Sequence, residues 1–117
     1  MANKVTNVTI ITSNTNDPIT LSVDILYGHA ATTTFLLNHI ALPPKQDSFS
    51  DMLLGTNNGL RHNTLIVTTA VAKKAPTTNC EVDYTIDGAL AQSVTQSILP
   101  FNGTDTVNTH TIIYSFI

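Results

Sequence analysis

Four histidines are the side chains of this sequence that could bind a metal ion or exchange a proton near neutral pH: His29, His39, His62 and His110. Metal sites built on one strand or helix place their histidines at i,i+2 or i,i+4, because both rings must reach the same ion. No two of these histidines have either spacing, and no His-Glu-x-x-His motif occurs. The sequence therefore predicts no metal site and no cofactor.

Candidate nucleophiles are equally isolated. Cys80 is the only cysteine, which excludes an intramolecular disulfide, and no basic residue lies close to it in sequence to activate the thiol. It begins a segment of alternating apolar residues, where a free cysteine is usually a small buried side chain. No Gly-x-Ser-x-Gly motif marks a serine nucleophile. We therefore predict a buried Cys80 and no enzyme.

Three carboxylates, those of Glu81, Asp83 and Asp87, alternate with apolar residues and share one face of a predicted strand. Neighbouring carboxylates can act as an acid–base pair where burial separates their pKa values. The sequence shows no apolar pocket beside these three, so we interpret them as the solvated face of a sheet. They do not follow the Asp-x-Asp-x-Asp-Gly spacing of a calcium loop.

The composition limits the partners that we expect. The 117 residues are 42% hydrophobic but only 11% charged, and 5 Lys and Arg stand against 8 Asp and Glu, for a net charge of −3. Nucleic-acid binding is not expected, because it requires a cationic surface. No apolar stretch approaches the ~20 residues that cross a bilayer, and the N-terminus lacks the pattern of a secretory signal. We expect a soluble protein with no membrane partner.

Alternation of apolar and polar residues predicts strands along most of the chain. The clearest are Ile19–Tyr27 and Cys80–Ile86, and the Asp-Gly dipeptide after the second predicts a hairpin over residues 80–98. Weaker patterns predict strands at Val5–Thr12, Thr32–Leu42, Thr64–Ala72, Ala89–Leu99 and Val107–Ile117. Within Ala89–Leu99, the spacing of Leu90, Val94 and Ile98 also suits a helix, and the adjoining turn decides for a strand.

These strands predict an all-β fold, a single antiparallel β-sandwich of jelly-roll or immunoglobulin-like type with about seven to eight strands and at most one short helix. The helix or turn is expected at Asp47–Leu54, where Phe49 and Leu53 share a helical face at i,i+4. Pro43-Pro44-Lys45 is expected to form a turn. No linker or repeat divides the chain, so residues 1–117 are predicted to form one domain.

Seven residues are candidate contacts with a ligand or a partner: Asn57, Asn58, Arg61, His62, Phe101, Phe116 and Ile117. The first four form the densest polar cluster in the middle of the chain, and the alternative for them is a solvated loop. Phe101 is the one aromatic residue that we expect near the surface, as a contact or as a lid on one end of the sandwich. The last two end an apolar strand that frays in water unless it is docked, so we expect a structural strand or an assembly contact.

Residues 4–86 have a distinctive order of strands and turns. A first strand ends in an Asn/Thr turn at Val8–Asn16, and a second strand follows at Ile19–Ile25. An apolar strand then runs into a Leu-Pro turn at Asn38–Pro44, before the strands Asn63–Val71 and Cys80–Gly88. This order resembles small β-sandwich modules of tailed-phage virion structural proteins.

The resemblance implies a capsid, neck, tail or fibre component located in the virion, a homo-oligomer that packs against itself and other virion proteins. The low charge agrees, since copies repel one another little, and the terminal strands are the expected edges that extend a neighbour's sheet. The alternative is a carbohydrate-binding or adhesin-type module, extracellular or on the cell surface, suggested by neutral polar loops such as Thr56–Gly59. The scarcity of aromatic residues weighs against sugar binding.

Overall fold

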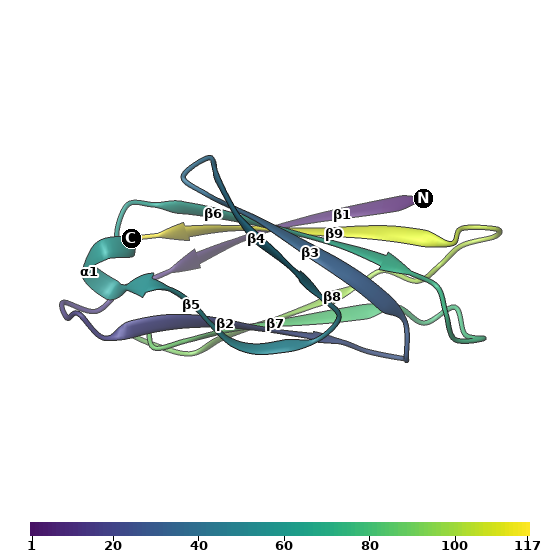
Figure 1. The fold of residues 1–117 in the computed structure, drawn as a ribbon, viewed down its shortest axis with the longest axis horizontal. Helices are drawn as coiled ribbons and strands as arrows, with labels where there is room; N and C mark the ends of the chain where they lie inside the picture. The colour runs from purple at the N-terminus through teal and green to yellow at the C-terminus, as the bar shows by residue number, and fades with distance from the viewer.

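The computed structural model describes residues 1–117 and consists of two β-sheets packed face to face (Figure 1). One sheet has the order β1 (Ala2–Ile10), β9 (Val107–Phe116), β6 (Thr64–Ala72), β3 (Ala30–Leu37) and β4 (Ile40–Gln46). The other has the order β5 (Phe49–Thr56), β2 (Pro18–Ile25), β7 (Glu81–Asp87) and β8 (Ser93–Ile98). A single helix, α1 (Asn57–Leu60), follows β5, and no helix has the length and apolar character that crossing a membrane requires.

The core lies between the two sheets and follows the alternation of the sequence. Every second residue of the central strands points inward and is fully buried, including Leu21 of β2, Tyr84 of β7 and Tyr114 of β9. Cys80 is buried in the same cluster, as predicted. Because side chains of a strand alternate between its two faces, a sandwich forms once one face of each sheet is apolar.

The all-β sandwich with one short helix is confirmed, but two details of the prediction are wrong. The strands number nine instead of seven to eight. The sandwich is also not purely antiparallel, since β1 pairs with β9 in parallel, from Ala2 beside Asn108 to Ile10 beside Phe116. Strands this far apart in sequence need no tight turn between them, so either direction of pairing is open to them.

The extra strand arises where one strand was predicted at Thr32–Leu42. The chain reverses at Asn38 and His39, whose φ angles of 48° and 66° are those of a tight hairpin turn, and returns as β4. The predicted turn at Pro43-Pro44-Lys45 therefore lies inside β4. Proline is tolerated there because β4 is an edge strand, whose outer side needs no backbone N–H.

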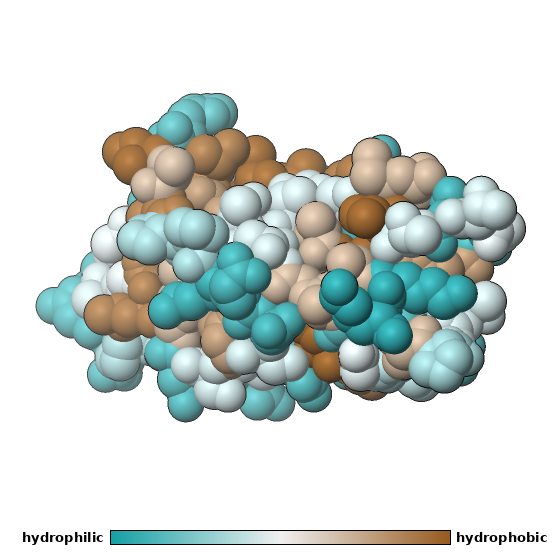
Figure 2. All heavy atoms as spheres, turned by 45° about the vertical axis from the view of Figure 1, so that its right-hand side comes forward, coloured by the Kyte–Doolittle hydropathy of each residue, from teal (hydrophilic) through white to brown (hydrophobic).

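The β3–β4 hairpin stands clear of the rest of the sandwich in Figure 1. Figure 2 shows hydrophobic surface below a hydrophilic tip at the upper left, where this hairpin projects. Ile40 and Leu36 are exposed in this hairpin, whereas hydrophilic and intermediate residues cover most of the remaining face in view.

The helix or turn predicted at Asp47–Leu54 is wrong, because these residues form most of strand β5. Phe49 is partly buried and Leu53 is exposed, so the two do not share a buried face. The helix begins instead after Thr56, whose side chain accepts a hydrogen bond from the backbone N–H of Gly59 at 3.0 Å. Such a cap satisfies one of the free N–H groups of the first turn.

The hairpin predicted over residues 80–98 is confirmed by the antiparallel pairing of β7 with β8. Its connection, residues 88–92, is longer than a tight two-residue turn. Gly88 is required in it, because a Cβ at this position would lie 2.0 Å from the carbonyl oxygen of Pro18 and φ is +93°.

Candidate functional site

Strands β1 and β8 form one long side of the sandwich, since each is the last strand of its sheet and the two lie against each other. We call this side the open edge, defined by β1, β8 and the connection 88–92. Neither the β1–β9 ladder nor the β7–β8 ladder contains a register shift, so both strands are regular along their length. Regular edge strands carry a row of backbone groups that another strand can pair with.

Apolar side chains gather along the open edge. Five of them are each more than half exposed: Val5, Ile11, Leu90, Val94 and Ile98. A hollow of about 390 Å³ lies between the end of β1 and residues 90–94, where Leu90 N–H donates to the carbonyl oxygen of Ile11 at 3.0 Å. The edge therefore combines free backbone groups with an apolar hollow.

Strand β8 presents both of its apolar side chains to solvent and its serine and threonine side chains to the core. Val94, Gln96 and Ile98 point outward and are exposed, whereas Ser97 is fully buried and its neighbours Ser93 and Thr95 are partly buried. This orientation is the reverse of that of an ordinary sandwich strand, which turns its apolar face to the core. The spacing of Leu90, Val94 and Ile98 places them on one face of a strand, but the sequence pattern does not predict that this face is exposed.

The N–H and C=O groups of successive β8 residues alternate between bonding to β7 and pointing away from it, just as the side chains alternate between the core and solvent. Leu99 N–H donates to the carbonyl oxygen of Cys80 at 3.0 Å, which marks the odd-numbered residues of this ladder as those bonded to β7. The N–H and C=O groups of Val94, Gln96 and Ile98 consequently face away from β7, toward the open edge. The residues with exposed side chains are thus also those with free backbone groups.

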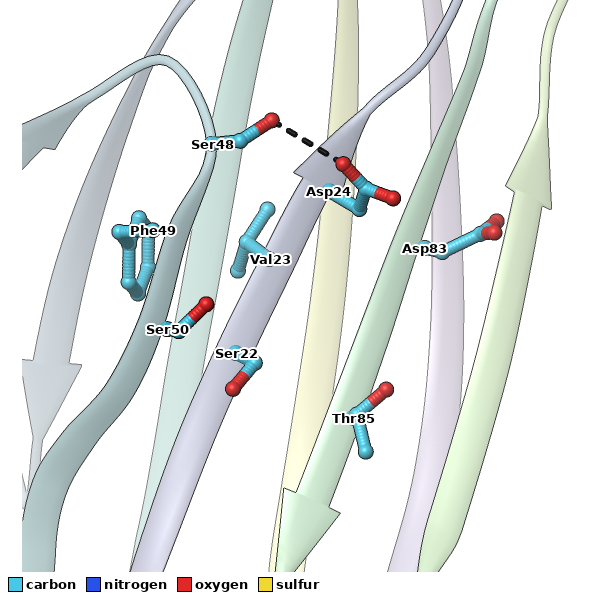
Figure 3. Close-up of a pocket in the computed structure, with 8 residues that line it drawn as sticks. All are labelled: Ser22, Val23, Asp24, Ser48, Phe49, Ser50, Asp83 and Thr85. Atoms are coloured by element: carbon cyan, nitrogen blue, oxygen red, sulfur yellow. Dashed lines mark hydrogen bonds between the residues drawn. The ribbon is translucent and has the colours of Figure 1, made fainter.

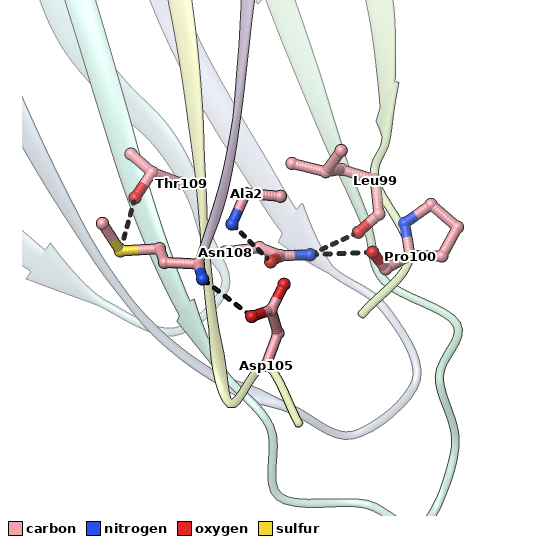
Figure 4. Close-up of polar contacts among 7 residues, drawn as sticks. Ala2, Leu99, Pro100, Asp105, Asn108 and Thr109 are labelled. Atoms are coloured by element: carbon pink, nitrogen blue, oxygen red, sulfur yellow. Dashed lines mark hydrogen bonds and ion pairs between the residues drawn. The ribbon is translucent and has the colours of Figure 1, made fainter. Parts of the chain in front are cut away.

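A buried asparagine joins the two strands of the open edge at one end (Figure 4). The side-chain amide of Asn108, on β9, donates to the carbonyl oxygens of Leu99 and Pro100 at 2.7 and 3.1 Å. Its oxygen accepts from Ala2 N–H at 3.3 Å. Asn108 is fully buried, so it links β1 in one sheet to the chain leaving β8 in the other.

A buried polar cluster lies behind β8. His110 Nδ1 is 2.8 Å from Ser97 Oγ, and His110 Nε2 is 3.6 Å from Cys80 Sγ. Burial, and secondarily the charge of Lys4, lowers the pKa of His110 to about 4, and burial raises the pKa of Cys80 to about 11. All three side chains are sealed between the sheets, so they stabilise the core and keep the polar face of β8 inward.

A second, polar hollow of about 370 Å³ lies on the outer face of the four-stranded sheet (Figure 3). Hydroxyl groups of Ser22, Ser50 and Thr85 line it together with the carboxylates of Asp24 and Asp83. Phe49 contributes little aromatic surface, because its ring points away in Figure 3 and packs against Phe35 with 5.9 Å between ring centres. We call this hollow the hydroxyl groove.

Asp83 is the unusual group of the hydroxyl groove, since its Oδ1 is buried without a hydrogen-bond partner. Desolvation, with contributions from Glu81 and Asp24, raises the pKa of Asp83 to about 6. Glu81, Asp83 and Asp87 share the outer side of β7, as predicted, but the expectation of a solvated face is wrong in part, because all three are partly buried. No three His, Cys, Asp or Glu side chains converge closely enough to hold a metal ion.

The residues of the predicted polar cluster lie together at the end of the sandwich that α1 closes. Two of them, Asn57 and Arg61, hold neighbouring segments in place through hydrogen bonds. Asn57 is fully buried, accepts from Ser13 N–H and donates to the carbonyl oxygens of Asp17 and Gly88. Arg61 donates to Thr12 Oγ1 at 3.0 Å and to a nearby carbonyl oxygen. Asn58 and His62 are exposed beside them.

The three other predicted contact residues lie at opposite ends of the sandwich. Phe116 and Ile117 end β9 beside α1, where Phe116 is buried and its carbonyl oxygen accepts from His62 N–H, while Ile117 remains half exposed. Phe101 precedes the start of β9, at the other end of that strand, and packs edge-on against His29 at 5.0 Å. The expectation that Phe101 lies near the surface is wrong, because it is 3% exposed.

No family model, curated protein or solved structure matches this chain significantly. Function is therefore inferred from the geometry of the open edge and the hydroxyl groove.

Proposed function

We propose that this chain is a structural assembly subunit that works by packing its open edge against other protein chains. The observation that carries the proposal is the orientation of β8, whose apolar side chains and free backbone groups both point out of the fold. Exposed apolar surface along a regular edge strand is a surface suited to association.

The resemblance of residues 4–86 to virion modules supports the narrower form of the proposal, a component of a phage virion located in the particle. One element of that resemblance, the Leu-Pro turn, does not count toward it, because Pro43 and Pro44 lie inside β4. A sandwich of jelly-roll or immunoglobulin-like type is part of this narrower form. The lone buried cysteine agrees with it, because a fold without disulfides forms in a reducing cytoplasm before assembly.

The test is the native mass of the protein by light scattering over a concentration series. We expect a defined oligomer for the wild-type chain, and a monomer for Val94→Lys, because a lysine on the edge strand brings an unpaired charge into the contact. Leu53→Lys is the matched control, since Leu53 is similarly exposed but lies on β5, at the opposite side of the sandwich. A wild-type chain that stays monomeric at millimolar concentration, alone and with proteins of its own particle, overturns the proposal.

The hydroxyl groove favours a second candidate function, a carbohydrate-binding or adhesin-type module. Its hydroxyl groups and two carboxylates are hydrogen-bonding partners of the kind that sugar hydroxyls take. Ser22 Oγ already accepts a bond from Asp51 N–H at 2.9 Å, whereas the hydroxyls of Ser50 and Thr85 have no protein partner. A glycan array probed with the wild-type chain and with Asp24→Asn tests it. Binding that is lost in the variant supports this function, and an array without binding removes it.

A further inference from the structure

The backbone groups along the outer side of β8 have the spacing that antiparallel pairing of two copies requires. The N–H and C=O groups without a backbone partner belong to Val94, Gln96 and Ile98, and antiparallel strands bond where such residues stand opposite each other. A two-fold axis at Gln96 sets Gln96 opposite the partner's Gln96, and Val94 opposite the partner's Ile98. All three pairs then exchange both backbone bonds.

The side chains favour the same register. With the axis at Gln96, both apolar residues of the exposed face meet an apolar residue, and the two Gln96 amides can hydrogen-bond to each other. Moving the axis to Thr95 keeps the backbone bonding but sets Val94 opposite a glutamine and leaves Ile98 opposite residue 92, which is also glutamine. Among registers that pair residues within β8, only the axis at Gln96 matches both apolar side chains with another. An axis at Val94 would set Ile98 opposite Leu90, which lies outside the strand and whose N–H is bonded to Ile11.

The distribution of charged residues near the open edge allows a second copy of the chain to bind there and opposes the binding of an anionic partner. Residues 88–99 contain no charged side chain, so two β8 strands meet without like charges opposite each other. The acidic row of Glu81, Asp83 and Asp87 lies one strand behind the edge. In the pair, the two acidic rows are three strand spacings, about 14 Å, apart, which exceeds the Debye length of about 8 Å at physiological salt.

Lys4 is the one basic residue at this edge, and its Nζ donates to the carbonyl oxygen of Ile98 at 3.2 Å. A carbonyl oxygen has two lone pairs, so Ile98 can still accept a bond from the partner. Resting on the proposed function, we infer that the open edge binds a second copy of this chain, through antiparallel pairing of β8 about a two-fold axis at Gln96. The product is one continuous eight-stranded sheet across both copies, built from the four-stranded sheet of each.

Disulfide trapping tests the register, because a disulfide forms only where two Cα atoms lie about 4.4–6.8 Å apart. We expect Gln96→Cys alone to form a covalent dimer on mild oxidation, at least about tenfold more than Val94→Cys or Ile98→Cys alone. A mixture of Val94→Cys with a size-tagged Ile98→Cys is expected to form the mixed dimer. The wild-type chain and Leu53→Cys are controls, the first because Cys80 is buried.

The outcomes separate this inference from the proposed function. Trapping through Gln96→Cys and through the mixed pair supports the register. An oligomer by light scattering that none of these cysteines traps overturns the β8 pairing but leaves the assembly role. Equal trapping of Val94→Cys alone overturns the axis at Gln96. A chain that traps nowhere and is monomeric by scattering, both alone and with proteins of its own particle, overturns both.

Discussion

The edge strands on the two long sides of the sandwich differ in their regularity and composition. At the open edge, β1 and β8 are regular, contain no proline and carry exposed valine and isoleucine. At the other side, which we call the protected edge and define as β4 and β5, the pairing of both strands contains register shifts. Pro43, Pro44 and Lys45 lie in β4, and Asp51 of β5 has a φ of 56°.

Because of this difference between the two edges, association with another chain is expected at the open edge. Proline, lysine and irregular pairing are the features by which proteins prevent an edge strand from pairing with another chain. They are concentrated on one side of this molecule and missing from the strands of the other, apart from Lys4 at the end of the open edge. Exposed apolar residues alone do not separate the sides, because Leu53 and Ile40 are exposed at the protected edge. The regularity of pairing and the absence of proline do separate them.

The largest effect is expected from Asn108→Ala, which removes the link between the two strands of the open edge. Two carbonyl oxygens and one N–H lose their buried partner, which we expect to lower the free energy of unfolding by about 3 kcal/mol. Urea unfolding measures it, with Asn58→Ala, an exposed asparagine, as control. A loss no greater than the control's contradicts a structural link here.

Acidification is expected to weaken the core behind the open edge. The pKa of His110 is lowered to about 4 by burial, while the unfolded chain titrates near 6.5, so between these values the unfolded state binds more protons. Stability from this group is complete above pH 6.5 and is lost as the pH falls toward 4. The expected loss between pH 7 and pH 4.5 is about 2 kcal/mol.

The ionisation of Asp83 changes the stability of the fold with pH in the opposite direction to that of His110, over the same pH range. Its folded pKa is raised to about 6, so its ionisation costs stability as the pH rises from 4 toward 6. The His110 measurement is therefore made by urea unfolding in an Asp83→Asn background, with His110→Gln added as the comparison. Equal pH slopes with and without His110→Gln would contradict the buried neutral imidazole.

The third prediction converts the protected edge into a second open edge. Replacing Pro43 and Pro44 by threonine restores two N–H groups to β4, in a Val94→Lys background that blocks the true open edge. We expect self-association to return, with an association constant about tenfold higher, or about 1.4 kcal/mol. Light scattering compares the self-association of this variant with that of Val94→Lys alone. A variant that stays monomeric would show that the prolines do not prevent pairing at this edge.

The smallest effect is expected from Asp51→Gly in the protected edge. A φ of 56° strains an aspartate but not a glycine, and the greater backbone entropy of unfolded glycine offsets part of the gain. We expect the midpoint of urea unfolding to rise by the equivalent of about 0.5 kcal/mol. A lower midpoint would mean that the strain is absent or that the carboxylate contributes to stability.

Much of the fold was readable from the sequence, because a strand with one buried face has a period of two residues. Thr64–Ala72 was predicted with its correct bounds, and the hairpin over 80–98 was predicted from its alternation and its Asp-Gly turn. The missed strand β4 and the false helix at Asp47–Leu54 lie at the protected edge. Edge strands have one neighbour and tolerate proline and irregular φ angles, so their sequences carry weak strand signals.

The candidate site was decided by the tertiary structure. The sequence determined that Val94 and Ile98 share one face of a strand and that Ser97 lies on the other, since this follows from the alternation of side chains alone. Which face points inward depends on what the opposite sheet offers. Here His110 of β9 provides a buried partner for Ser97, so the polar face turns to the core and the apolar face remains in water.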